Sequence, residues 1–342
     1  MMECEQITGG IQVPQPWQQS AWQQLVSQQR SGRLAHAYLL QARVGSGRRQ
    51  FAQALASWLL CERVATQSSA CGECAQCLLQ VRGPHPDLMV VIPEAGSKTI
   101  KIDQIRQLGD FIQQTAHQTG AWKVVLLCPA EAMGIAAANS LLKNLEEPPG
   151  RVLFLLLTDI GAHLLPTLRS RCQPLVLGDA TQEQSLQWLA EHTSADQADV
   201  QQALALAPGA PLLALQLLEQ GVPTWRNVLA EQLREMEQGR LSPLEVARHC
   251  EKLGGQSAAP YAIHFLQTWL RDRIGSVSAK QSDPAAALRL LTGFHRVLQD
   301  VNQRLVSGAN PNVLMNLEYL LSTWLDCHQK SQQLVESATF NT

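Results

Sequence analysis

The fold of the first half of the chain is decided by residues 36–49, HAYLLQARVGSGRR. An apolar, β-prone run, His36 to Gln41, is followed by a glycine-containing loop and then by a helical pattern from Arg48 to Cys61. A loop that joins a strand to the start of a helix lies where phosphate-binding loops lie, because unpaired backbone N–H groups point out of a helix N-terminus. The stretch therefore predicts an α/β domain of the nucleotide-binding type.

The residues of this loop depart from the pattern of a working phosphate-binding loop. In G-x-x-x-x-G-K-[ST], the lysine meets the terminal phosphates and the hydroxyl holds magnesium. The defining positions here are Ala42, Gly47, Arg48 and Arg49, with Gly45 inside the loop. Arg48 keeps a positive charge, but Arg49 offers no hydroxyl to a metal ion. The sequence predicts a degenerate loop that has lost one magnesium ligand.

A second departure falls at the end of the strand expected from Lys123 to Cys128. A hydrolysing enzyme ends this strand with Asp-Glu, which binds magnesium and orients water, whereas this chain has Cys128 and Pro129. The nearest acid, Glu131, lies past the strand end. We therefore expect no ATP hydrolysis by this chain alone, and the sequence leaves open whether the loop still binds a nucleotide.

Outward from the loop, short apolar runs alternate with helical patterns through residue 177, which predicts a mostly parallel sheet covered by helices. We expect this α/β domain to span residues 1–179. The expected strands are His36–Gln41, Leu88–Ile92, Lys123–Cys128, Val152–Thr158 and Pro174–Leu177, and the helices between them are Arg48–Cys61, Asp103–His117 and Ile135–Glu147.

After Gly178 the strand signal ends and the chain is expected to be helical. Thr181 and Gln184 form a capping box for the first helix, which runs to about His192. We expect a three-helix lid domain over residues 180–221, a helical collar or oligomerisation domain over 222–330 and a flexible tail over 331–342. The further helices expected are Asp196–Leu206, Ala210–Gln220, Trp225–Gln238, Pro243–Leu253, Ala259–Ile274, Pro284–Ser307 and Pro311–Gln329.

Composition limits the classes of function. The 342 residues carry a formal net charge of −2, so the chain has no overall basic field of the kind a stand-alone nucleic-acid binder uses. The longest apolar run, Val152 to Leu157, is too short to cross a bilayer. The first ten residues contain acids and no apolar core, which is not typical of a secretory signal. We expect a cytoplasmic protein without a membrane partner.

Four cysteines form a candidate metal site. Cys71, Cys74 and Cys77 recur at three-residue spacing, and Cys61 ends the preceding helix. Four thiolates suit tetrahedral zinc and leave no open position, so the zinc would be structural and would hold an insertion at residues 61–77. Two other interpretations are buried free thiols and an iron–sulfur cluster, although the usual fourth Cys-Pro is missing after Cys77. Cys128, Cys172, Cys250 and Cys327 are expected to be packing residues.

Several segments together resemble the bacterial clamp-loader ATPases, which are AAA+ proteins. They are Pro16-Trp17, His36-Ala37, the loop at 41–47, the four-cysteine insertion, His85-Pro86-Asp87, ANSLLKNLEEPP at 138–149 and LRSRC at 168–172. The resemblance covers nearly the whole chain. The N-L-L-K-x-L-E-E-P-P run followed by S-R-C is highly specific to clamp loaders.

The resemblance implies a role for Arg171, the arginine of S-R-C. In the family this residue is an arginine finger that reaches the γ-phosphate of ATP in the neighbouring subunit, a task that suits a planar cation. The alternative is an exposed or ion-paired structural arginine, a role expected more for Arg169. Active relatives also carry a nucleotide-sensing arginine near 207–211, where this chain has Ala-Pro-Gly-Ala-Pro.

The resemblance also implies partners and a place in replication. The chain would be a rigid, non-hydrolysing stator that helps to load the sliding clamp onto primed DNA, without catalytic activity of its own. Its partners would be the ATPase subunits tau and gamma and the clamp-opening delta subunit, with the clamp and primed DNA met through the assembled complex. It would thereby be a component of a DNA-directed DNA polymerase holoenzyme, a nucleotidyltransferase.

Two other functions compete with this interpretation. An independent ATPase or helicase-loader-like motor would need a competent metal site, which Arg49, Cys128 and Pro129 do not provide. A zinc-dependent DNA-binding protein reading duplex through residues 61–77 would need a basic recognition helix, and this segment is mostly neutral or acidic. ATP turnover by the isolated chain would favour the first, and salt-dependent DNA affinity would favour the second.

Overall fold

The computed structural model describes residues 11–117, 121–254, 265–266, 289, 292–301 and 312–339. Within the chain, two compact units are distinguished by their internal contacts. The first comprises Met1–Ser194 and Leu204–Leu215, and the second comprises Ala195–Ala203 and Gln216–Thr342. The boundary between them passes through the segment 180–221, which the sequence predicted to be one lid domain. The division into lid and collar domains stays a prediction.

A five-stranded parallel sheet forms the centre of the first unit, with the strand order β2-β3-β4-β1-β5. The strands are β1 (Ala37–Ala42), β2 (Leu88–Val91), β3 (Lys123–Leu127), β4 (Val152–Asp159) and β5 (Gln173–Val176). Each coincides with a predicted strand to within one residue at either end. The predicted fold class is confirmed.

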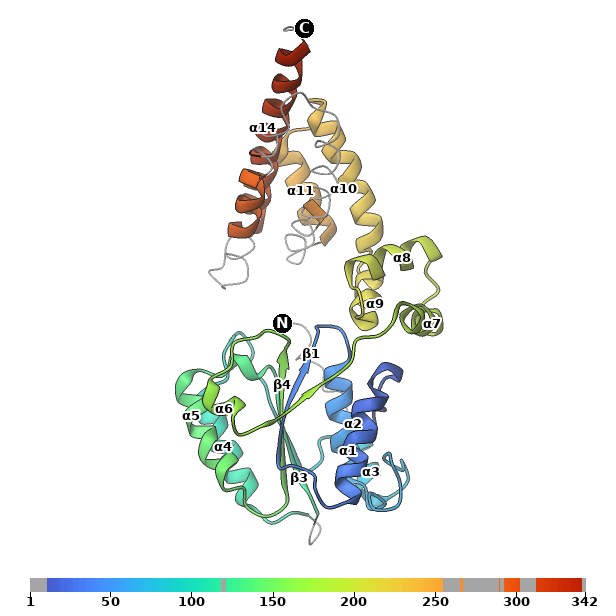
Figure 1. The fold of residues 1–342 in the computed structure, drawn as a ribbon, viewed down its shortest axis with the longest axis vertical. Helices are drawn as coiled ribbons and strands as arrows, with labels where there is room; N and C mark the ends of the chain where they lie inside the picture. The colour runs from blue at the N-terminus through green and yellow to red at the C-terminus, as the bar shows by residue number, and fades with distance from the viewer. Residues whose placement is uncertain are drawn as a thin grey trace. The chain divides into compact units, whose positions relative to one another are not determined.

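Helices cover both faces of this sheet (Figure 1). On one face lie η2 (Pro16–Gln18), α1 (Gln19–Arg30) and α2 (Arg48–Leu60), and beyond α2 comes α3 (Ala75–Arg82). On the other face lie α4 (Ile102–Gln113), η3 (Ala130–Ala132), α5 (Ile135–Glu146) and α6 (Pro166–Arg169). The loop follows the carboxyl end of β1, and α5 ends beside the amino end of β1, where His36 Nε2 donates to the Leu145 carbonyl.

The three inner strands, β1, β3 and β4, are buried on both faces, as their near-continuous apolar runs predict, whereas the edge strand β5 exposes Gln173, Pro174 and Val176. Tyr38 and Leu40 of β1 pack on the α2 side, whereas Ala37 and Leu39 pack on the α4 and α5 side, because successive side chains of a strand point in opposite directions. Trp58 anchors the α2 side and is fully buried. Burial of an aromatic side chain of this size stabilises a fold by about 2–3 kcal/mol.

Beyond the sheet the described chain is helical. The helices are α7 (Gln182–His192), α8 (Gln197–Leu206), α9 (Pro211–Glu219), α10 (Val222–Glu237), α11 (Pro243–Gly254) and α14 (Val313–Thr339). The capping box predicted for α7 is present: the Gln184 N–H donates to Thr181 Oγ1 at 3.1 Å and the Thr181 N–H donates to Gln184 Oε1 at 2.9 Å. The predicted helices Ala259–Ile274 and Pro284–Ser307 fall largely outside the described residues.

Two helix ends differ from the prediction. The helix α4 ends at Gln113, four residues before the expected His117, and the Gln114 N–H bonds back to Phe111 in a tighter turn. The helix α14 continues to Thr339, into the segment 331–342 that was expected to be a loose tail. No proline or glycine occurs between Val313 and Thr339, so nothing in the sequence stops the helix. Polarity alone was a poor sign of its end.

In the part of the chain that the structure describes, no helix combines the length and apolarity that a membrane crossing requires.

Candidate functional sites

The loop after β1 has the backbone shape that its two glycines allow. Gly45 has φ +76° and Gly47, the residue that precedes α2, has φ +88°, and both lie in the region that side chains rarely adopt. Ala42 is the buried last residue of β1. The strand, loop and helix therefore follow one another as the sequence predicted.

The outer side of this loop is covered by the start of α9. The Leu212 N–H donates to the carbonyl of Gly45 at 3.2 Å. A Cβ added at Gly45 would collide with Leu213, and one added at Gly47 would lie 3.6 Å from Leu212. Only glycine at position 45 lets the backbones approach this closely. The segment 211–213 thus lies directly on the loop, within the first unit.

The N-terminal residues of the fold cover the same loop from another direction. Trp17 Nε1 and Gln18 Nε2 both donate to the carbonyl of Ser46, at 2.8 and 2.9 Å. Trp17 is buried, and its ring packs edge-on against Trp188 of α7. The Pro16-Trp17 segment that carries part of the resemblance therefore serves to hold the loop.

The charge of the loop is neutralised from inside the chain. Arg48 is paired with Asp159, the last residue of β4, and its side chain is only 7% exposed. The Asp159 N–H in turn contacts Glu131 Oε1 at 3.4 Å. Asp159 therefore neutralises Arg48, the cation that stands at the lysine position of a working loop. Arg49, the next residue, is half-buried in the first turn of α2.

At the end of β3 the structure places no acid. Cys128 is buried and Pro129 follows it. Glu131 lies in η3, where one carboxylate oxygen faces Asp159 and the other is buried without a hydrogen bond among the described residues. The pairing of Arg48 with Asp159 was missed by the sequence analysis, because the two residues are separated by 111 positions and share no motif.

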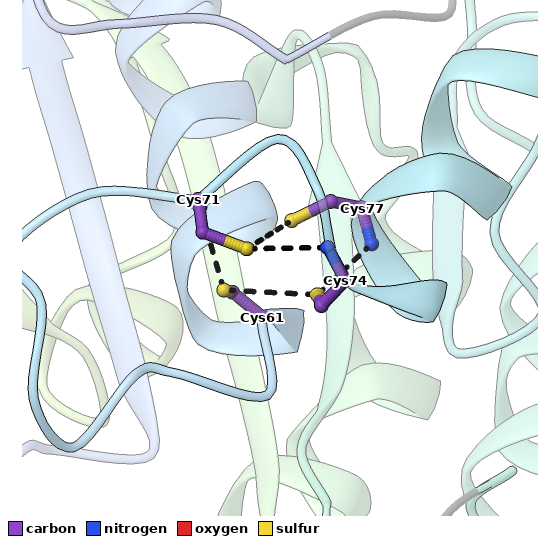
Figure 2. A group of neighbouring side chains, drawn as sticks. All are labelled: Cys61, Cys71, Cys74 and Cys77. Atoms are coloured by element: carbon purple, nitrogen blue, oxygen red, sulfur yellow. Dashed lines mark hydrogen bonds between the residues drawn. The ribbon is translucent and has the colours of Figure 1, made fainter.

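The four predicted metal ligands converge, as Figure 2 shows. Cys61 follows α2, Cys71 lies in the loop, Cys74 caps the N-terminus of α3 and Cys77 lies in its first turn. Their sulfur atoms all lie within 4.8 Å of one another, with 3.9 Å for both the Cys61–Cys74 and the Cys71–Cys77 pairs. Thiolates held tetrahedrally at about 2.3 Å from zinc are about 3.8 Å apart. The cluster could hold such an ion.

The surroundings of the sulfurs favour a metal site. Backbone N–H groups of Glu73 and Cys74 lower the pKa of Cys71 to about 6, because they stabilise the thiolate. Burial raises the pKa of Cys61 and Cys77, whose thiolates therefore need the charge of a bound cation. N–H groups of Arg63, Cys74 and Cys77 lie 3.3 to 3.5 Å from the sulfurs. This spacing suits a single ion better than the multi-atom core of an iron–sulfur cluster, whose thiolates lie farther apart.

A buried histidine ties this insertion to the sheet. His85 Nδ1 accepts the N–H of Asp87 at 3.0 Å, so the neutral ring carries its proton on Nε2 and donates to Gln76 of α3 at 2.8 Å. Burial lowers the pKa of His85, which favours this neutral form. Asp87 accepts the N–H of His117 through both carboxylate oxygens. The His85-Pro86-Asp87 segment is therefore structural.

Arg171 lies between α6 and β5, next to the end of α5. Its Nε donates to Glu146 Oε1 at 2.7 Å, and Nη2 pairs with the same oxygen. Its side chain is 34% exposed. Arg169 is exposed and makes no ion pair within the described ranges, and its expected structural role stays a prediction. Motif position did not reveal that Arg171 has a partner.

Comparisons with known proteins agree with one another. A family model described as "DNA polymerase III, delta subunit" matches residues 17–181. The DNA polymerase III subunit delta' of Pseudomonas aeruginosa is 44% identical over 328 residues, which is 90% of this chain and 96% of that protein. The subunit delta' of Haemophilus influenzae is 33% identical, with 88% and 94% covered, and that of Escherichia coli is 35% identical, with 76% and 75% covered.

A solved structure of a DNA polymerase III gamma subunit-related protein from Thermotoga maritima aligns with a TM-score of 0.44 at 19% identity, covering 89% of this chain and 99% of that one.

The parallel sheet, the degenerate loop after its first strand and the L-E-E-P-P and S-R-C segments define an AAA+ protein of the clamp-loader class. The identity to relatives over most of the chain narrows this class further. The chain belongs to the DNA polymerase III subunit delta' family.

Proposed function

We propose that this chain is a non-hydrolysing stator of the DNA polymerase III clamp loader, which supplies Arg171 as an arginine finger to the ATP site of a neighbouring subunit. Its partners are the tau and gamma ATPase subunits and the delta subunit. The assembled complex loads the sliding clamp onto primed DNA. The chain contributes to the holoenzyme without a reaction of its own.

The observation that carries this proposal is the position of Arg171 relative to the loop of its own chain. In the parallel pairing of β1 with β5, Tyr38 lies opposite Gln173. Arg171 precedes Gln173 at the amino edge of the sheet, whereas the loop follows Ala42 at the carboxyl edge. The strand from Tyr38 to Ala42 alone is about 13 Å long at about 3.3 Å per residue. A phosphate that Arg171 contacts must therefore belong to another subunit.

The state of the chain's own loop supports the non-hydrolysing half of the proposal. Arg48 is committed to Asp159, and the position of the metal-binding acids is taken by Cys128 and Pro129. The covering segment 211–213 lies on the backbone that would cradle phosphates. A nucleotide would have to displace these contacts without gaining the usual lysine and magnesium interactions.

Zinc is the proposed ion of the four-cysteine cluster. Zinc prefers four thiolates in tetrahedral geometry, and a site closed by four protein ligands has no position for a substrate. The ion would hold Cys61 at the end of α2 against the start of α3, and its role would be structural. The helix α3 has Arg82 as its only basic residue and exposes Leu78 and Val81, which is unlike a DNA-reading helix.

The isolated full-length chain tests the non-hydrolysing half directly. We expect no ATP turnover with magnesium, with or without primed DNA, and no rise in the anisotropy of a fluorescent ATP analogue at millimolar protein. An active ATPase subunit of the same complex serves as the positive control under identical conditions. Turnover by the purified chain would instead support an independent ATPase, and salt-dependent DNA affinity would support the DNA-binding alternative.

A further inference from the structure

We propose that Glu146 is a positioning residue for Arg171: it holds the guanidinium so that one edge faces outward, ready for the phosphate of the neighbouring subunit. This inference rests on the proposed function, because it assumes that Arg171 acts on a phosphate in trans. It gives a function to Glu146, a carboxylate of the L-E-E-P-P run to which the proposed function above assigns no role.

The contacts of Arg171 define which of its N–H groups are taken. Nε and Nη2 share Oε1 of Glu146, with 2.7 Å from Nε. Nη1 donates to the carbonyl of Thr167 at 3.1 Å and lies 3.4 Å from Ser170 Oγ. The guanidinium is thus held on its Nε–Nη2 side by a carboxylate and through Nη1 by a backbone carbonyl.

These contacts leave one side of the guanidinium for a ligand. A guanidinium has five N–H groups arranged along three edges, and two parallel N–H groups point away from its end, one each from Nη1 and Nη2. Glu146 takes one N–H of Nη2 and the Thr167 carbonyl accepts one N–H of Nη1 at 3.1 Å, so each terminal nitrogen keeps a second N–H. Phosphate oxygens are bound through two parallel N–H groups of this kind. Glu146 therefore directs the end of Arg171 without occupying it.

Glu146 stands on a part of the fold that is itself fixed. It is the last residue of α5, directly after the buried Leu145, whose carbonyl accepts a hydrogen bond from His36 Nε2 at 2.9 Å. His36 lies immediately before β1, so two segments that carry the family resemblance meet at the amino edge of the sheet. A side chain placed on such rigid elements can orient its neighbour, which a loop residue would do less well.

A latch is the opposing interpretation, in which Glu146 competes with the phosphate and restrains the finger. The geometry argues against it, because Glu146 contacts the Nε–Nη2 edge of the guanidinium and not its outward end. The phosphate also need not displace Glu146, because the outward end of the guanidinium is available. Positioning is therefore the role that the geometry favours.

The test compares clamp loaders assembled with wild-type chain, Glu146→Ala, Glu146→Gln and the matched control Glu147→Gln, each verified by gel filtration. We expect Glu146→Ala to lower the kcat of DNA-stimulated ATP hydrolysis about tenfold at the site served, with little change in KM, because the finger loses its orientation. Glu146→Gln still offers a carbonyl oxygen to Nε and Nη2, so it should stay within about threefold of wild type. Glu147, which is exposed and makes no described contact with Arg171, should tolerate substitution.

A double substitution separates failure of this inference from failure of the proposed function. If Glu146 acts through Arg171, Glu146→Ala should cause no further loss in an Arg171→Ala background. Wild-type or raised turnover of Glu146→Ala, beside an impaired Arg171→Ala, would overturn the positioning role and leave the finger intact. An unimpaired Arg171→Ala would instead remove the proposed function on which the inference rests.

Discussion

Arg171→Ala is expected to reduce ATP turnover at the site that this chain serves by about 10³-fold, while the clamp loader still assembles. An arginine supplied from a neighbouring subunit stabilises the charge of the transferring phosphoryl group, and its loss costs about 10³ to 10⁵ in rate. The measurement is DNA-stimulated ATPase of the reconstituted loader under single-turnover conditions, which resolve one impaired site among several.

Arg171→Ala should leave the folding stability of the chain nearly unchanged. Its partner Glu146 is about half exposed, so the freed carboxylate is hydrated and folding stability should change by less than about 1 kcal/mol. Arg169→Ala is the matched control, since Arg169 is exposed and lies in the same turn. Arg171→Lys should recover only part of the rate, because an ammonium keeps the charge but lacks the planar fork. Full turnover of Arg171→Ala would reduce this chain to a purely structural role.

Cys74→Ser is expected to remove the bound zinc, from about one ion per chain to nearly none. Structural zinc sites contribute apparent binding free energies on the order of 10 kcal/mol, which are lost when one of four thiolates is replaced. Cys74 also caps α3, because its sulfur accepts the N–H of Cys77. Elemental analysis of the purified chain measures the loss.

Loss of zinc should change the surroundings of two tryptophans that contact the insertion. The indole N–H groups of Trp22 and Trp58 donate to the carbonyls of Ser68 and Gln67, both within the insertion. Tryptophan fluorescence should therefore change on chelation. Cys172→Ala, which alters a buried thiol elsewhere in the domain, should retain zinc. Retention of zinc by Cys74→Ser, or iron with visible absorbance in the wild type, would contradict the assignment.

Local patterns in the sequence predicted the sheet and the cysteine cluster well. The three inner strands, β1, β3 and β4, read as apolar runs because both of their faces are buried, whereas the edge strands β2 and β5 are less buried. The cysteines were recognisable from spacing alone. The end of α14 was not predicted, because polar composition was taken as a sign of a loose tail and no helix breaker was present.

Contacts between distant segments could not be predicted in the same way. Nothing in the pattern of residues 211–213 indicates that they lie on Gly45, and nothing in Arg48 identifies Asp159 as its partner. Such contacts depend on the completed topology, which brings the ends of β1 and β4 together. The sequence showed which phosphate- and metal-binding residues the loop lacks. The contacts that replace them, from residues 211–213 and from Asp159, are visible only in the structure.

The cover over the loop has a consequence for how the chain responds to the energy state of a cell. In a working ATPase the contacts around this loop depend on whether ATP or ADP is bound, so the shape of the subunit follows the ratio of the two. Here the contacts come from Trp17, Gln18 and the start of α9, which are always present at a fixed stoichiometry. We expect the loop to keep one conformation at any ATP:ADP ratio.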